Sequence, residues 1–217
     1  MNLEQARHNM IQQQIRPWQV SDQDVLNLLE IIKRENFAPP AYQNIAFADL
    51  EIPLPCGQHM LPPKIEARLL QTLQLKPHES VLEIGTGSGY MAALLSYHSA
   101  QVLTVEIHPE LAAFAQENLR KNNISKVNVI TGDGVHGWPQ QAPYDVIVVS
   151  GGLSVLSPAL LTQLKPGGRL CAFVGAAPVM KAQLITCVGQ KEYHSEDLFE
   201  TWVTPLVNAI EAPRFSF

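Results

Sequence analysis

The sequence predicts an α/β fold of the doubly wound class, with a mainly parallel sheet. From residue 80 onward, short apolar runs alternate with helical patterns, as in parallel sheets covered by helices. The run at residues 81–84 leads into glycines at three alternate positions and then an apolar segment, which is the strand–turn–helix unit of nucleotide-type folds. The 217 residues are 46% hydrophobic and 16% charged, an ordinary composition for one large domain with a sizeable core.

The N-terminal part is predicted to be helical and then irregular. Residues 3–14 are expected to form a weak helix that closes at Arg16-Pro17. An N-cap within residues 21–24 opens a second helix, which is expected to end near Asn36. Four prolines among residues 39–55 exclude a long helix there, and an irregular segment of this length is usually functional.

The remaining elements follow in alternation after a helix from Lys64 to about Leu73. Strands are expected at residues 81–84, 102–106, 127–131, 145–150 and 169–174. Helices are expected near residues 89–97, 109–122 and 157–164. Residues 182–188 and 191–203 are expected to form two antiparallel strands around a turn near Gly189-Gln190.

Charge and cysteine content exclude several classes of protein. The net charge is −5 and no long basic run occurs, which argues against nucleic acid as a partner. The three cysteines are far apart and form no C-x-x-C pair, so we expect reduced thiols and no metal site. Neither a signal peptide nor an 18-residue apolar stretch is found, so we expect a cytoplasmic protein without a membrane partner.

Residues 83–89 read Glu-Ile-Gly-Thr-Gly-Ser-Gly, and this motif points to the cofactor. Tyr90 stands where the dinucleotide fingerprint G-x-G-x-x-G has its third glycine, which weakens a dehydrogenase interpretation. An acid followed by G-x-G-x-G resembles the first motif of S-adenosylmethionine (SAM) methyltransferases. The resemblance implies a class I, Rossmann-like SAM-methyltransferase fold, with an N-terminal helical extension and a C-terminal antiparallel hairpin.

The candidate cofactor-binding residues all stand at the carboxyl ends of predicted strands, where open α/β sheets bind their ligands. Glu83 is expected to bind the ammonium of SAM, and the turn with Gly85, Thr86, Gly87 and Gly89 to face its methionyl part. Glu106 offers two oxygens to the ribose hydroxyls. Asp133, followed by Gly134, is expected to accept the adenine amino group. Asp145 lies at the other end of its strand, where we expect a structural role.

Over nearly its whole length the chain resembles the protein-L-isoaspartate O-methyltransferase family. The resemblance rests on five stretches, at residues 35–39, 46–55, 81–90, 132–145 and 163–170. It implies methyl transfer to the abnormal carboxylate of isoaspartyl residues in damaged proteins, with SAM as the cofactor. We expect one domain over residues 1–217, in which residues 1–63 carry helices and the substrate loop and residues 64–217 form the SAM-binding core.

The substrate loop departs from the family pattern Gly-Gln-Thr-Ile-Ser-x-Pro. His59 replaces the threonine, and Leu61 replaces the serine whose hydroxyl lies at the site of transfer in the family. Ser150, followed by two glycines, also stands in an altered stretch. We therefore expect His59 or Ser150 to supply the missing hydrogen bond at the catalytic position of Leu61, unless the substrate has changed.

Three functions remain open at this point. The leading one is transfer to isoaspartyl residues of a protein or peptide. The second is a SAM-dependent methyltransferase with another acceptor, such as a small molecule, which the hydroxyl-free Leu61 favours. The third is a non-catalytic SAM-binding relative, which would bind SAM without turnover. The sequence does not specify the oligomeric state.

Overall fold

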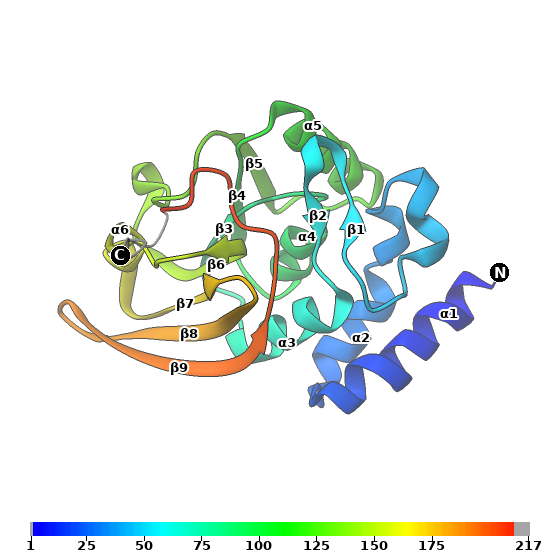
Figure 1. Cartoon of the computed structure of the whole chain (residues 1–217), viewed down its shortest axis with the longest axis horizontal. Coiled ribbons are helices and arrows are strands. Elements are labelled where there is room, and N and C mark those ends of the chain that lie inside the picture. Colours follow the sequence, from blue (N-terminus) through cyan, green and yellow to red (C-terminus); the bar gives the residue numbers. More distant parts are fainter. Residues whose placement is uncertain (1, 211–217) are drawn as a thin grey trace, which may run out of the picture.

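A seven-stranded sheet with the order β5-β4-β3-β6-β7-β8-β9 forms the centre of the computed structural model, which describes residues 2–210 (Figure 1). Strands β3 to β7 are parallel, and β8 and β9 are antiparallel to their neighbours. The strands are β3 Ser80–Ile84, β4 Gln101–Glu106, β5 Val127–Thr131, β6 Tyr144–Leu153, β7 Leu164–Ala176, β8 Val179–Gly189 and β9 Glu192–Thr201. The predicted fold class, including the C-terminal hairpin, is confirmed.

The order of the strands fixes where a ligand can bind. The chain runs from β3 outward to β4 and β5 and then returns to β6 on the other side of β3. The direction of winding changes beside β3, and ligands of open α/β sheets bind at such a switch point, beyond the carboxyl ends of the strands. The helices of the core are α3 Pro63–Leu73, α4 Tyr90–Tyr97, α5 Pro109–Lys121 and α6 Pro158–Leu161.

The first N-terminal helical segment extends about as far as the sequence predicts, whereas the second helix is shorter. Helix α1, Leu3–Met10, begins at an Asn2 cap and continues as a wider π-helical turn through Ile15. Helix α2, Gln23–Ile31, begins at an Asp22 cap but ends five residues before Asn36. Helix α2 ends where the chain turns toward Arg34, and the Arg34 side chain is fully buried in the core.

The proline-rich segment forms a small ribbon that the sequence did not predict. Strands β1, Ile52–Pro53, and β2, His59–Met60, pair antiparallel, with Ile52 opposite Met60. The turn between them has Cys56 at φ 59° and Gly57 at φ 69°, and the glycine adopts this left-handed conformation without strain. The ribbon presents the loop at His59 and Leu61 to the carboxyl ends of the central strands.

Strands β7 and β8 are longer than predicted, whereas β9 and the helix before β7 are shorter. Helix α6 stops at Leu161, because Gln163 turns its side chain to the carbonyl oxygens of His136 and Ala159, and its own carbonyl accepts from Tyr144. Strand β7 therefore starts at Leu164 and not near residue 169.

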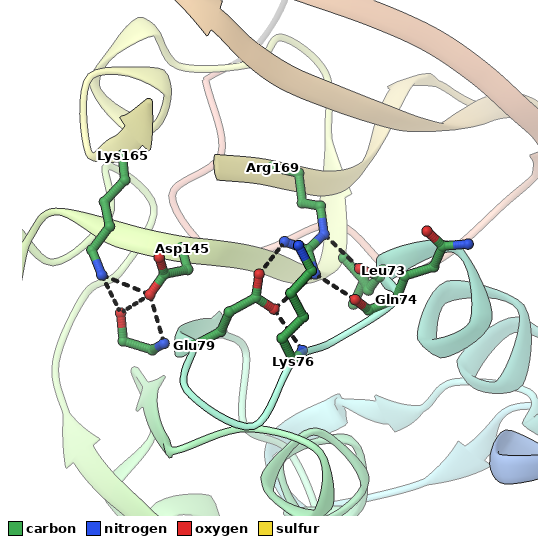
Figure 2. Close-up of polar contacts among 8 residues, drawn as sticks. Leu73, Gln74, Lys76, Glu79, Asp145, Lys165 and Arg169 are labelled. Carbon is green, nitrogen blue, oxygen red and sulfur yellow. Dashed lines mark hydrogen bonds and ion pairs between the residues drawn. The ribbon is translucent and has the colours of Figure 1, made fainter. Parts of the chain in front are cut away.

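Ion pairs tie the amino ends of the strands together, at the edge of the sheet away from the glycine turn (Figure 2). Arg169 donates to both oxygens of Glu79 at 2.8 and 2.9 Å and to the carbonyl oxygens of Leu73 and Gln74. Lys165 pairs with Asp145 at 2.6 Å, and Asp145 also accepts from Ser80. These contacts agree with the structural role expected for Asp145.

Within residues 2–210, no helix combines the length and the apolar character that crossing a membrane requires.

Candidate functional site

A cleft of about 640 Å³ opens at the carboxyl ends of β3, β4 and β6, the position that the switch point predicts. We call it the main cleft. A smaller hollow of about 270 Å³, the inner cavity, adjoins it. Both spaces are lined by His59, Leu61, Gly85, Gly87 and Ser150, so they form one continuous site.

The glycine turn after β3 forms the floor of the site. Gly85 has φ 89° and Gly87 has φ 53°, conformations that side chains with a Cβ rarely adopt, and both residues line the main cleft. Thr86 points away from it, and its hydroxyl shares a 2.7 Å hydrogen bond with Thr104. Gly89 lies outside the lining of both spaces. A Cβ there would lie 3.3 Å from Ala115, so its contact is with helix α5.

Glu106 stands at the end of β4 with its carboxylate on the main cleft. One oxygen accepts from the Gly87 N–H at 2.9 Å, and the other accepts from the His108 N–H at 3.0 Å. Each oxygen keeps a free lone pair, because a carboxylate has about four acceptor positions. The group is thus held in a fixed orientation and can still accept from two ligand hydroxyls.

The far end of the main cleft is formed by the loop after β5. Asp133 accepts from the Val135 N–H and from Asn208 Nδ2 at 2.9 Å. Gly134 packs against β3 and β4, where a Cβ would meet Ile84 at 3.1 Å. Asp133 lines the main cleft, and each of its two oxygens already accepts one hydrogen bond from the protein, so a ligand donor would use a remaining lone pair.

Glu83 is fully buried at the inner cavity. Its carboxyl accepts from Thr104 at 2.7 Å and from Ser150 at 2.9 Å, both neutral donors. Burial raises its pKa to about 8, against the opposing effect of these two bonds, and the nearby carboxylates of Glu66 and Glu106 raise the pKa further. The Ser150 side chain thus lies at the site, but its hydroxyl already donates a hydrogen bond to Glu83.

The two loop residues that depart from the family pattern take different positions. His59 is exposed at the rim, and its Nδ1 lies 3.2 Å from the Thr204 hydroxyl. Leu61 is buried, and it lines both spaces. The residues expected to carry catalysis therefore do meet at one site, but Leu61 contributes only an apolar wall.

Arg34 holds this loop in place, and sequence reasoning missed it. Its guanidinium donates to the carbonyl oxygens of Ala46 at 2.9 Å and Leu61 at 2.6 Å and pairs with Glu66. It also lies over the ring of Tyr90, 5.1 Å from the centroid. No periodic signal marks Arg34 in the sequence. Glu66 could have been noticed, since it stands four residues before Leu70 on the apolar face of a helix.

The segment after β9 covers part of the main cleft. It returns from the hairpin across the central strands, in red in Figure 1, and Thr204 and Leu206 bond the two backbone groups of Gly152 at 2.9 Å. The Leu206 side chain lies so close to Gly151 that a Cβ there would come within 2.6 Å. We call residues 203–208 the covering segment. The sequence gives no indication of this contact, because it depends on the whole fold.

Metal ions do not fit this site. Among residues 2–210 no group of three or more histidine, cysteine, aspartate or glutamate side chains is arranged to hold one. The polar groups suit an organic ligand with hydroxyl and ammonium donors.

The family model and the most similar relatives all point to one protein family. The sequence model of the family described as protein-L-isoaspartate(D-aspartate) O-methyltransferase matches residues 5–210. A protein-L-isoaspartate O-methyltransferase of Koribacter versatilis is 45% identical over 170 residues, which cover 78% of this chain and 77% of that protein. One from Brucella anthropi is 37% identical over 207 residues, 95% of each chain.

Solved structures agree with these relatives. A protein-L-isoaspartate O-methyltransferase superposes with a TM-score of 0.81 at 25% identity, covering 94% of this chain and 67% of the other. A second structure, described as a putative enzyme of this kind from Plasmodium falciparum in complex with S-adenosyl-L-homocysteine, gives a TM-score of 0.76 at 21% identity. It covers 95% of this chain and 99% of the other, and it supports the fold.

Proposed function

The chain belongs to the protein-L-isoaspartate(D-aspartate) O-methyltransferase family, and we propose that it transfers a methyl group from SAM to isoaspartyl carboxylates through the site at the glycine turn. It is a methyltransferase with SAM as its cofactor, as the sequence motif predicts. The observation that carries the site assignment is Glu106, whose carboxylate is fixed by two backbone N–H groups and faces a cleft floored by glycines.

The residues present fit SAM. Glu106 can accept from the ribose hydroxyls, and Gly85 and Gly87 let a ligand approach the main chain. The Nε2 atom of His108, buried at the wall of the cleft, has no hydrogen-bond partner among the described residues, and a ligand in the cleft can satisfy it.

Methyl transfer to a carboxylate does not require the protein to act as a general base. When bound, SAM supplies a methyl group on a sulfonium, which a carboxylate oxygen of the acceptor can take to give a methyl ester. Free carboxylates have pKa values near 4, so the acceptor is ionised at neutral pH without a general base. The protein must then align the acceptor and exclude water. The buried Leu61 and the covering segment supply the apolar walls for this.

His59 is the donor that best replaces the family serine. The Ser150 hydroxyl is engaged with Glu83, whereas His59 lies at the rim and bonds only the Thr204 hydroxyl. An imidazole N–H there can donate to an incoming carboxylate. A hydrogen bond to a charged group contributes about 1.5–3 kcal/mol, which is roughly tenfold to a hundredfold in rate.

The buried Leu61 side chain favours a second acceptor class, a small molecule with an apolar part next to its carboxylate. For the leading function the partner is a protein or peptide with isoaspartyl residues. We propose the cytoplasm as the location, which suits the three free thiols of Cys56, Cys171 and Cys187.

Methyl transfer from labelled SAM to an isoaspartyl peptide tests this function, with the matching aspartyl peptide as the control. We expect label in the isoaspartyl peptide alone, as a base-labile ester. Protein that binds SAM but labels neither peptide would contradict isoaspartyl transfer. A small carboxylic acid that is labelled instead would establish the second acceptor class.

A further inference from the structure

Two buried carboxyl groups face the inner cavity from different elements. Glu83 stands on β3 with no exposed surface, and Glu66 stands in the first turn of α3 with 3% exposed. Both line the cavity together with Gly85, Gly87 and Ser150. A pair of carboxyl groups in one buried space is costly unless a cation or protons compensate for their charge.

The protein supplies less positive charge than these groups require. Glu83 has only hydroxyl donors, from Thr104 and Ser150. Arg34 pairs with one oxygen of Glu66, but it also donates to the carbonyl oxygens of Ala46 and Leu61. The second oxygen of Glu66 has no hydrogen-bond partner among the described residues. It is therefore available to a ligand in the cavity.

The pKa values of both carboxyl groups are raised, in agreement with this deficit. Burial raises the pKa of Glu66 to about 7, although Arg34 opposes the shift. Burial raises that of Glu83 to about 8, and the charges of Glu66 on α3 and Glu106 on β4 add to the increase. His59 on β2 is the other titratable group in the lining of the cavity. An added cation would favour the ionised form of both carboxyl groups.

We infer that Glu66 binds the cofactor together with Glu83, and that the two carboxylates hold the ammonium of its amino-acid end in the inner cavity. This inference rests on the proposed function, because it assumes SAM in the main cleft. An ammonium matches the site better than a metal ion, since it has three N–H donors for acceptors on different elements. Glu66 then acts on the ligand directly and is more than the partner of Arg34.

Two ligands that differ only in the amino-acid end give a direct test. S-adenosylhomocysteine has the ammonium, and 5′-deoxy-5′-methylthioadenosine has the same nucleoside and sulfur without it. Calorimetry on Glu66→Gln should show about tenfold weaker binding of S-adenosylhomocysteine and unchanged binding of methylthioadenosine. Glu35→Gln is the matched control, because Glu35 is a buried carboxylate paired with Arg7 outside both spaces. It should leave both affinities unchanged.

Proton release on ligand binding gives a second test. If Glu66 had only a structural role, Glu66→Gln would release as many protons as wild type. At pH 7, in buffers of different ionisation enthalpy, wild type should release protons on binding S-adenosylhomocysteine, and Glu66→Gln should release fewer. Equal loss of affinity for both ligands in Glu66→Gln, or no loss for either, would overturn the role of Glu66. If wild type binds neither ligand, the SAM site of the proposed function fails as well, so the two failures are distinguishable.

Discussion

Glu106 is a buried carboxylate that is held by the backbone and still faces the main cleft. The residue as a whole is only 4% exposed, yet it lines the main cleft. Backbone N–H groups orient both oxygens of its carboxylate. A carboxylate held in this way loses little conformational entropy when a ligand binds. It is therefore the group whose removal should affect the cofactor most.

Glu106→Ala should weaken binding of S-adenosylhomocysteine roughly 10- to 100-fold, since each hydrogen bond to a charged group contributes about 1.5–3 kcal/mol. Calorimetry measures the affinity, and circular dichroism shows whether the fold is kept. Glu117→Ala, an exposed carboxylate on α5, should leave the affinity unchanged. Full affinity in Glu106→Ala would remove the ribose assignment.

Leu61→Ser should raise kcat/KM for an isoaspartyl peptide by about tenfold, because the new hydroxyl can donate to the acceptor carboxylate. It should also lower Tm, since Leu61 is buried and replacement of a core leucine by a small residue costs about 2–5 kcal/mol. Leu54→Ser is the matched control, a buried leucine of the same segment outside both linings. A gain in both variants, or in neither, would mean that the hydroxyl at position 61 is not what limits transfer.

The loop between β1 and α3 depends on a clamp that lies outside it. Arg34 joins Ala46, Leu61 and Glu66, which belong to three separate parts of the chain. Because the guanidinium has no exposed surface, removal of one partner of the ion pair leaves the other charge in the interior.

Arg34→Met should therefore lower the free energy of unfolding by about 3–5 kcal/mol, the usual cost of an unpaired buried charge. The double variant Arg34→Met/Glu66→Met should regain most of this stability, because no charge remains to be compensated. Urea unfolding of the wild type, of Arg34→Met, of Glu66→Met and of the double variant gives the coupling energy. Additive losses in the double variant would show that the pair does not act as a unit.

The covering segment packs closely against two glycines, Gly151 and Gly152. Gly151→Ala places a Cβ only 2.6 Å from Leu206 Cδ2. Because this distance is too short for two carbon atoms, the covering segment must move. We expect a lower kcat/KM and faster proteolysis within residues 203–208. Addition of Leu206→Ala removes the clash and should restore protection from the protease. Unchanged proteolysis in Gly151→Ala would contradict this contact.

For the whole molecule, the buried Glu83 should make stability depend on pH. Burial raises its pKa from the ordinary glutamate value of 4.5 to about 8, so between these values the folded protein keeps a proton that the unfolded chain has released. The folded state then binds more protons, and the free energy of unfolding falls as pH rises through this interval. The stabilising contribution is complete below pH 4.5 and lost above pH 8.

Glu83→Gln cannot ionise, so it should escape this loss. Without cofactor, Tm of the variant and of wild type should be similar near pH 5, and the variant should be several degrees more stable at pH 8, given about 2–4 °C per kcal/mol at this size. Glu66 contributes in the same direction but is present in both proteins. Parallel Tm curves between pH 5 and 8 would contradict the raised pKa.

The sequence predicted those features that depend on local pattern. The alternation of strands and helices, the glycine turn and the cluster of Glu83, Glu106 and Asp133 at strand ends all follow from periodicity and from the direction of parallel strands. Thr104 carried a usable signal as well, being a polar residue inside an apolar strand. Helix ends were predicted less well, as at Ile31 and Leu161, because tertiary contacts of Arg34 and Gln163 determine them.

The features that the sequence did not predict all depend on distant contacts. Asn208 meets Asp133 across 75 positions, and Thr204 meets His59 across 145. No local pattern encodes such pairs. Glu66 carried a local signal, as a charged residue on the apolar face of α3, but its place in the inner cavity depends on how α3 packs against α2, α4 and β7.

A crystal structure with S-adenosylhomocysteine would test the site directly, because it locates every part of the ligand at once. We predict the ribose hydroxyls on Glu106, the adenine near Asp133 and the ammonium in the inner cavity between Glu83 and Glu66. A ligand bound away from the glycine turn would contradict the cofactor site as a whole. A nucleoside in the main cleft with its amino-acid end turned to solvent would keep that site and contradict the role of Glu66.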